Sequence, residues 1–117
     1  MISLAIVGGR DYTDYDTFEI IVDEYIKEMG IPLQIVSGGA TGVDTMAELY
    51  AKKHNIPTLI FKADWKQHGK KAGILRNIDI IDAATHVLAV PTAKSIGTYD
   101  SINRAKKLNK VLKVVNV

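Results

Sequence analysis

SGGATGVDTMAE, residues 37–48, comes directly after a short apolar run at residues 33–36. Its three glycines are followed by apolar residues at helical spacing from Val43 onward. A short strand that leads through glycines into a helix is typical of parallel α/β folds. Two interpretations fit the glycines. They form either a cradle of backbone N–H groups for an anion or a plain turn in which Thr41 and Asp44 make a capping box.

The same alternation of short apolar runs and helical patterns covers the rest of the chain. The other predicted strands lie at residues 2–7, 58–61, 87–90 and 111–115. The predicted helices lie at residues 18–29, 43–55, 72–83 and 98–109. The polar stretch 62–71, which contains Trp65, is predicted as a loop. This order predicts one α/β domain over residues 1–117, with a mostly parallel five-stranded sheet between two layers of helices.

Composition restricts the classes of function. The chain has no cysteine, so it holds neither a disulfide framework nor a thiolate zinc site. The three histidines lack metal-ligand spacing, and we expect no metal and no cofactor. No apolar run is long enough for a signal peptide core or a membrane span, so we expect a cytoplasmic protein without membrane contact.

The net charge of +2 comes mainly from two lysine-rich blocks, at residues 62–71 and 106–113. Such blocks are most often solvated surface, and a dedicated nucleic-acid face usually carries more arginine and interleaved aromatic residues. The charge pattern therefore argues against a nucleic-acid partner. A small single-stranded nucleic-acid module using Lys66, Lys70 and Lys71 remains the least favoured alternative.

The loops after the predicted strands are where a parallel sheet binds ligands. Arg10 follows two glycines after the first strand, and its planar fork suits a phosphate, although a surface pair with Asp11 or Asp14 fits as well. Asp14 or Asp16 is expected to cap the first helix, and Glu19 three residues on favours Asp16.

Four ordered motifs resemble the SLOG superfamily, specifically its small cpYpsA-related branch. They are GGRDYTDYD at 8–16, SGGATGVDTMAELYA at 37–51, ADWKQHGKKAGILRN at 63–77, and THVLAV at 85–90 with the later pair Gly97-Thr98. The resemblance implies a Rossmann-like three-layer α/β/α fold that binds a nucleotide or a nucleotide-derived small molecule. Relatives in this family often associate with copies of themselves, so the resemblance also implies a homo-oligomer as an expectation.

The loops and the resemblance together give one set of candidate ligand-binding residues. The set is Gly8, Gly9, Arg10, Asp11, Ser37, Gly38, Gly39, Thr41, Gly42, Asp44, Arg76, Asn77, Gly97 and Thr98. The phosphate is expected on the amides of residues 38–42 and 97–98, between Arg10 and Arg76.

The superfamily includes the Lonely Guy phosphoribohydrolases, whose motif P-G-G-x-G-T-x-x-E carries a catalytic glutamate. The matching stretch here is AKSIGTYDS, which places Ser101 at the glutamate position. A hydroxyl cannot replace that carboxylate, so we assign no catalytic residue. We expect a nucleotide sensor or sequestering module. The alternative is a nucleotide-processing hydrolase that uses Asp11, Asp44 or Asp100.

Overall fold

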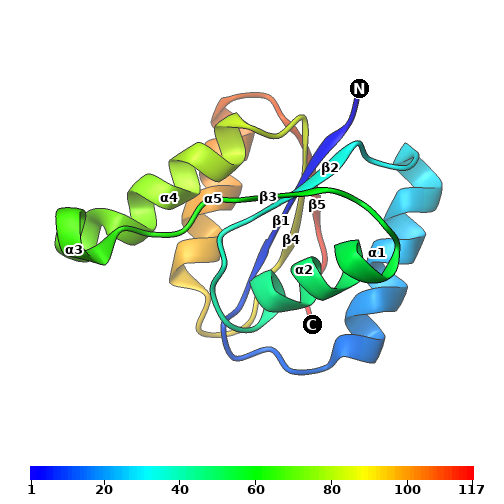
Figure 1. Ribbon diagram of the computed structural model, residues 1–117, viewed down its shortest axis with the longest axis horizontal. Helices are drawn as coiled ribbons and strands as arrows, with labels where there is room; N and C mark the ends of the chain where they lie inside the picture. The colour runs from blue at the N-terminus through cyan, green and yellow to red at the C-terminus, as the bar shows by residue number, and fades with distance from the viewer.

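The computed structural model describes residues 1–117 and alternates strands with helices along the whole chain (Figure 1). The strands are β1 (Ser3–Gly8), β2 (Gln34–Ser37), β3 (Thr58–Ile60), β4 (His86–Val90) and β5 (Val111–Val114). The helices are α1 (Tyr15–Met29), α2 (Val43–Lys53), α3 (Trp65–His68), α4 (Ala72–Asp82) and α5 (Ile96–Lys107). A 3₁₀ turn, Gly69–Lys71, joins α3 to α4.

All five strands are parallel, in the order β3-β2-β1-β4-β5. Helices α1 and α2 cover one face of the sheet, and α4 and α5 cover the other (Figure 1). The prediction of a Rossmann-like three-layer fold is confirmed, with a sheet that is parallel throughout. The strand order reverses between β1 and β4, and in folds of this kind ligands bind in the crevice at such a point.

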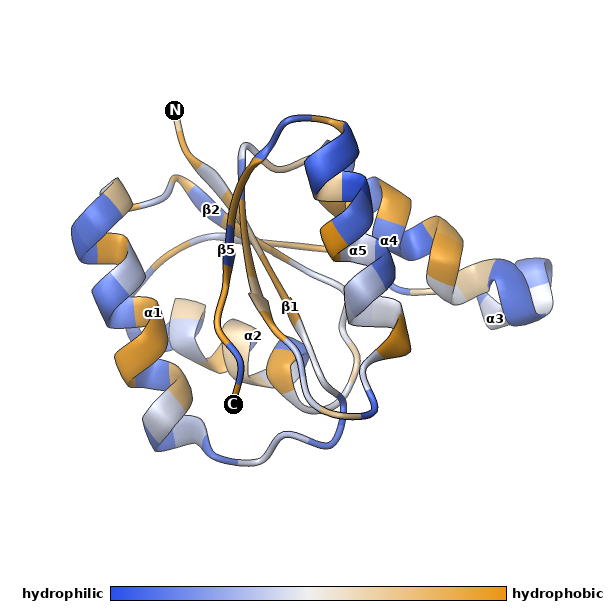
Figure 2. Cartoon of the chain, turned by 180° about the vertical axis from the view of Figure 1, so that it is seen from behind, coloured by the Kyte–Doolittle hydropathy of each residue, from blue (hydrophilic) through white to orange (hydrophobic).

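The central strand β1 explains why its sequence is apolar without alternation. Leu4 and Ile6 pack into the core on the side of α1 and α2, whereas Ala5 and Val7 pack on the side of α4 and α5. Since successive side chains of a strand point to opposite faces, a strand covered on both sides needs apolar residues at every position. Figure 2 shows this as a continuous hydrophobic colour through the middle of the sheet.

The first helix begins earlier than its apolar stripe indicates. Asp14 is its N-cap, and Asp14 Oδ1 accepts a hydrogen bond from the Thr17 amide at 3.1 Å. Of the two candidate caps, the preference for Asp16 with Glu19 was wrong. Asp16 lies inside the first turn, where its charge favours the helix dipole.

The capping box of Thr41 and Asp44, which belonged to the plain-turn interpretation, is not formed. The N-cap of α2 is Gly42, and no side chain caps the helix. The carbonyl of Gly9 takes that place, because it accepts a hydrogen bond from the Val43 amide at 3.2 Å. The Thr41 hydroxyl turns instead to the Arg10 carbonyl, at 3.4 Å. The loop that follows β1 therefore caps the N-terminus of α2 with a backbone carbonyl.

The polar stretch predicted as a loop contains α3, which sequence periodicity could not indicate because it is only four residues long. Asp64 caps it, accepting from the Gln67 amide at 3.1 Å. Figure 1 shows α3 at the outer end of α4, away from the sheet. None of the helices has the length and apolar character needed to cross a membrane.

Candidate functional site

A cavity of about 470 Å³ lies at the point where the strand order reverses. Its floor is the end of β1, where Gly8 pairs with Val90 of β4 and the Gly9 amide donates to the Val90 carbonyl at 3.2 Å. The two loops that leave these strands are linked as well, since the Thr92 hydroxyl donates to Asp11 Oδ1 at 2.6 Å. We call this space the first cavity.

The start of α5 offers backbone donors to the first cavity. Its N-cap, Ser95, does not cap the helix, because the Ser95 hydroxyl accepts from the Thr92 amide at 2.7 Å. The amides of Ile96, Gly97 and Thr98 consequently make no hydrogen bond within the protein, and all three residues line the cavity. Unpaired amides at a helix start attract anions through their hydrogens and the helix dipole.

Arg76, on α4, lines the same cavity. Only 9% of the residue is exposed. Nη1 donates to the Gly38 carbonyl at 3.0 Å, and Nε donates to Asn77 Oδ1 at 3.3 Å. Nη2 has no hydrogen-bond partner in the chain, and it remains accessible to solvent. Burial lowers the pKa of Arg76, Asp44 opposes that shift, and Arg10 adds to it. A largely buried guanidinium with one nitrogen that has no hydrogen-bond partner favours an anionic ligand.

Positive charge exceeds negative charge around the first cavity. Arg10 is exposed and takes part in none of the ion pairs of the structure, so the alternative of a surface pair with Asp11 or Asp14 is not formed. The charged residues that line the cavity are four cations and two carboxylates: Arg10, Lys70, Arg76 and Lys94, with Asp11 and Asp44. An excess of this sign favours an anionic ligand.

Asp44 is the buried carboxylate of the site, with 8% of the residue exposed. Burial raises its pKa, while the hydrogen bond from the Ala40 amide at 3.2 Å and the charge of Arg76 hold the pKa down. Asp11 is the opposite case. It is exposed, and the Thr92 hydroxyl lowers its pKa. The two carboxylates that face the cavity are therefore in different protonation environments.

A second cavity, of about 370 Å³, lies next to the first. The two cavities have Arg10, Ala40 and Arg76 in common. The remaining walls of the second cavity come from the loop after β2 and the segment before α4: Gly38, Gly39, Thr41, Lys62, Ala63 and Trp65. No carboxylate lines it.

Most of the predicted glycines are required by packing inside the protein. A Cβ at Gly8 would lie 2.5 Å from the Val90 carbonyl, and one at Gly42 would lie 2.3 Å from the Gly9 carbonyl. A Cβ at Gly9 would likewise meet the Thr92 hydroxyl at 2.3 Å. Gly97 differs, because its Cβ would meet only Asn77 Nδ2, at 3.6 Å. Packing does not explain a glycine there, whereas access to the cavity would.

The structure brings most of the predicted residues to the two cavities. The first cavity is lined by Gly8, Gly9, Arg10, Asp11, Asp44, Arg76, Asn77, Gly97 and Thr98, and the second by Arg10, Gly38, Gly39, Thr41 and Arg76. Two predicted residues line neither. They are Gly42, which is at the loop junction, and Ser37, which is fully buried. The Ser37 hydroxyl instead contacts α2, where its partners are the Asp44 carbonyl at 3.2 Å and Glu48 Oε2 at 3.3 Å.

Sequence reasoning missed several lining residues, among them Ile74, Lys94 and Ile96. Lys94 and Ile96 lie in the loop and first turn after β4, a position that could have drawn attention to them. Ser101 is buried at the cavity wall, and its hydroxyl donates to the Gly97 carbonyl at 3.3 Å. No glutamate lines the first cavity, and Asp100 lies outside it. The structure gathers no group of three or more side chains that could hold a metal ion.

Comparison with known proteins gives three kinds of match. Residues 2–68 match the family described as YspA, cpYpsA-related SLOG family. Gene 61 protein of Mycobacterium phage D29 is 37% identical over 109 residues, which cover 87% of this chain and 86% of that protein.

The solved structures that resemble the chain are two DNA processing protein A molecules. The protein from Streptococcus pneumoniae has a TM-score of 0.77 at 19% identity, over 97% of this chain and 50% of the solved one. The protein from Helicobacter pylori, described for its single-stranded DNA binding mode, has a TM-score of 0.72 at 24% identity, over 97% and 64%. The chain thus spans half to about two thirds of these structures. At such identities the likeness establishes the shared fold.

Proposed function

Since the chain belongs to the YspA, cpYpsA-related SLOG family, we propose that it binds a nucleotide or a nucleotide-derived small molecule in the first cavity. The ligand's phosphate rests on the unpaired amides of Ile96, Gly97 and Thr98. Arg10 and Arg76 neutralise the phosphate's charge.

One observation carries this proposal. Arg76 is nine-tenths buried with Nη2 unpartnered, and the residue lines the same cavity as three unpaired helix amides. Arg76 has given up most of its contact with water, and burying a charged group costs free energy. A phosphate supplies the missing acceptors to both sets of donors at once, and charge-assisted hydrogen bonds of this kind are the strong ones.

Binding without turnover fits the side chains at the cavity wall. Ser101 stands where the phosphoribohydrolases have their catalytic glutamate, so that position has no carboxylate. Its hydroxyl donates to the Gly97 carbonyl. The buried Asp44 already accepts from the Ala40 amide and can accept a ribose hydroxyl with its other oxygen. These features favour a sensor or sequestering module over a phosphoribohydrolase.

Calorimetry with a panel of nucleoside 5′-monophosphates tests the proposal. Arg10→Ala should weaken binding by about tenfold or more, because a charge-assisted hydrogen bond contributes roughly 1.5–3 kcal/mol. Lys66→Ala is the matched control, since Lys66 is exposed and lines neither cavity. Chromatography of the same mixtures should recover the nucleotide intact. Absence of binding by every member of the panel, or equal binding by the Arg10→Ala chain, would contradict the proposal.

Single-stranded nucleic acid is the second candidate ligand. The fold likeness to DNA processing protein A and the all-cationic charge of the second cavity favour it. A strand that contacts several phosphates would bind with a steep dependence on salt, close to 0.7 per phosphate on a double-logarithmic plot. A mononucleotide in the first cavity carries only one or two negative charges, so its affinity should depend on salt much less steeply.

A further inference from the structure

The two cavities meet at Arg10 and Arg76, which line both of them. Each cavity alone is within the range of about 300–1,000 Å³ typical of sites for small organic ligands. A mononucleotide in the first cavity therefore leaves the second one free. The two guanidinium groups stand where a second, linked unit would have to cross from one cavity to the other.

The chemistry of the second cavity differs from that of the first. Its charged side chains are Arg10, Lys62 and Arg76, and no carboxylate accompanies them. Its aromatic wall is Trp65, which is 53% exposed. One edge of the indole lies close to Gly73 of α4, since a Cβ added there would lie 3.4 Å from Trp65 Cη2. An aromatic face beside cations suits a base together with the phosphate that links it.

The rim of the first cavity indicates that the ligand is short. Ile74 and Ile96 line that cavity and are exposed by 55% and 87%. A polyanionic strand that continued past the first cavity would have to cross these apolar side chains, which offer its phosphates neither donors nor charge. Two nucleotide units occupy the two cavities and need not extend past these side chains.

We infer that the ligand is a dinucleotide, with its terminal phosphate on the α5 amides in the first cavity and its second base stacked on Trp65 in the second. The linking phosphodiester passes between Arg10 and Arg76, and Lys62 contacts its charge. The inference rests on the proposed function of the first cavity and adds the class of ligand to it.

Trp65 is the only tryptophan of the chain, so its fluorescence reports on the second cavity alone. The probes are AMP, the 5′-phosphorylated dinucleotide pApA, and 5′-phosphorylated oligoadenylates of four and eight residues. Titration with pApA should quench Trp65 strongly and give a dissociation constant at least about tenfold below that of AMP, because stacking of one base contributes a factor of this size or more. The longer oligonucleotides should bind no tighter than pApA.

Two substitutions separate the cavities. Trp65→Ala and Lys62→Ala should each remove most of the advantage of pApA over AMP while leaving AMP affinity within about twofold. Trp65→Phe should keep most of the advantage, since a phenyl ring still stacks. Lys66→Ala, a lysine substitution one residue beyond Trp65 and outside both cavities, should change neither affinity.

Equal affinities for AMP and pApA, or quenching by AMP as strong as that by pApA, would overturn the inference and leave the proposed function standing. Affinity that keeps rising from two to eight nucleotides would overturn it in favour of a strand-binding surface. If neither AMP nor pApA binds, the proposed function itself fails.

Discussion

Arg76 lies against Gly38 so closely that the glycine has no room for a side chain. Nη1 of Arg76 donates to the Gly38 carbonyl at 3.0 Å, and a Cβ on Gly38 would lie 2.7 Å from Arg76 Cδ and 2.8 Å from Asp44 Oδ2. The glycine-rich loop after β2 thus holds the arginine and the buried carboxylate of the site in position. Gly38 is thus required by packing inside the protein, whereas the sequence alone favoured access for a ligand as the reason for a glycine there.

Gly38→Ala should destabilise the protein by about 1–3 kcal/mol, the usual effect of overpacking a filled site. Gly97→Ala is the matched control at the same cavity, because its Cβ would meet one atom at an ordinary distance of 3.6 Å. Its effect should stay within about 1 kcal/mol, since alanine suits a helix better than glycine does. Urea denaturation of both variants measures the difference. Equal stabilities would mean that the loop yields to a methyl group at Gly38 without cost.

Gly97→Ala should nevertheless weaken nucleotide binding by about tenfold, or roughly 1.4 kcal/mol. The added methyl group would stand at the cavity, over amides that make no hydrogen bond within the protein. Calorimetry with AMP measures the loss, and competition by inorganic phosphate checks that the phosphate subsite is the one affected. A variant that keeps both its stability and full affinity would show that the phosphate does not rest at the start of α5.

The strands and long helices were predictable because their apolar residues repeat at fixed periods. The rule that parallel strands place their loops at one edge then predicted that Arg10 and Arg76 would converge, and both line the same cavity. The errors fall where a contact distant in sequence decides the local structure. The Gly9 carbonyl replaces a side-chain cap on α2, and the orientation of Ser37 depends on Glu48. No pattern within a segment carries such information.

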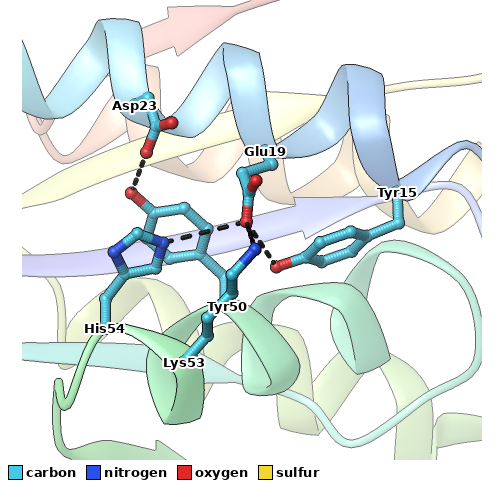
Figure 3. A network of polar contacts seen from close by, with 6 residues as sticks. All are labelled: Tyr15, Glu19, Asp23, Tyr50, Lys53 and His54. Atoms are coloured by element: carbon cyan, nitrogen blue, oxygen red, sulfur yellow. Dashed lines mark hydrogen bonds and ion pairs between the residues drawn. The ribbon is translucent and has the colours of Figure 1, made fainter.

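The polar network between α1 and α2 provides a stability test away from the site (Figure 3). Tyr50 is almost fully buried, and its hydroxyl donates to Asp23 Oδ1 at 2.5 Å. Tyr50→Phe should therefore destabilise the protein by about 1–2 kcal/mol. Tyr25→Phe is the matched control, since the buried hydroxyl of Tyr25 has no partner, and its removal should be neutral or stabilising. Thermal and urea unfolding of the two variants measure this, and a Tyr25→Phe variant as unstable as Tyr50→Phe would contradict the assignment.

The same tyrosine predicts how stability changes at alkaline pH. Burial and Asp23 raise the pKa of Tyr50 above its ordinary value of 10.0. A group whose pKa is higher in the folded state contributes stability below its unfolded pKa and loses that contribution as the pH rises further. Stability should fall above about pH 10, and Tyr50→Phe should reduce the slope without abolishing it, because burial also raises the pKa of Tyr12, Tyr15 and Tyr25. An unchanged alkaline slope in the variant would remove Tyr50 from this account.

Asp44 should produce the corresponding effect at acid pH. Burial raises the pKa of Asp44 above its ordinary value of 3.8, despite the Ala40 amide and Arg76. Its contribution to stability is present in full below pH 3.8 and is lost as the pH rises through the raised pKa. Asn in place of Asp44 has no charge to bury, and its side-chain oxygen can still accept from the Ala40 amide. Asp44→Asn should therefore match the parent near pH 4 and exceed it in stability at pH 7, as measured by urea unfolding at both values. If the parent instead gains on the variant between these pH values, the attraction of Arg76 outweighs the burial of the carboxylate, and the site is held together as an ion pair.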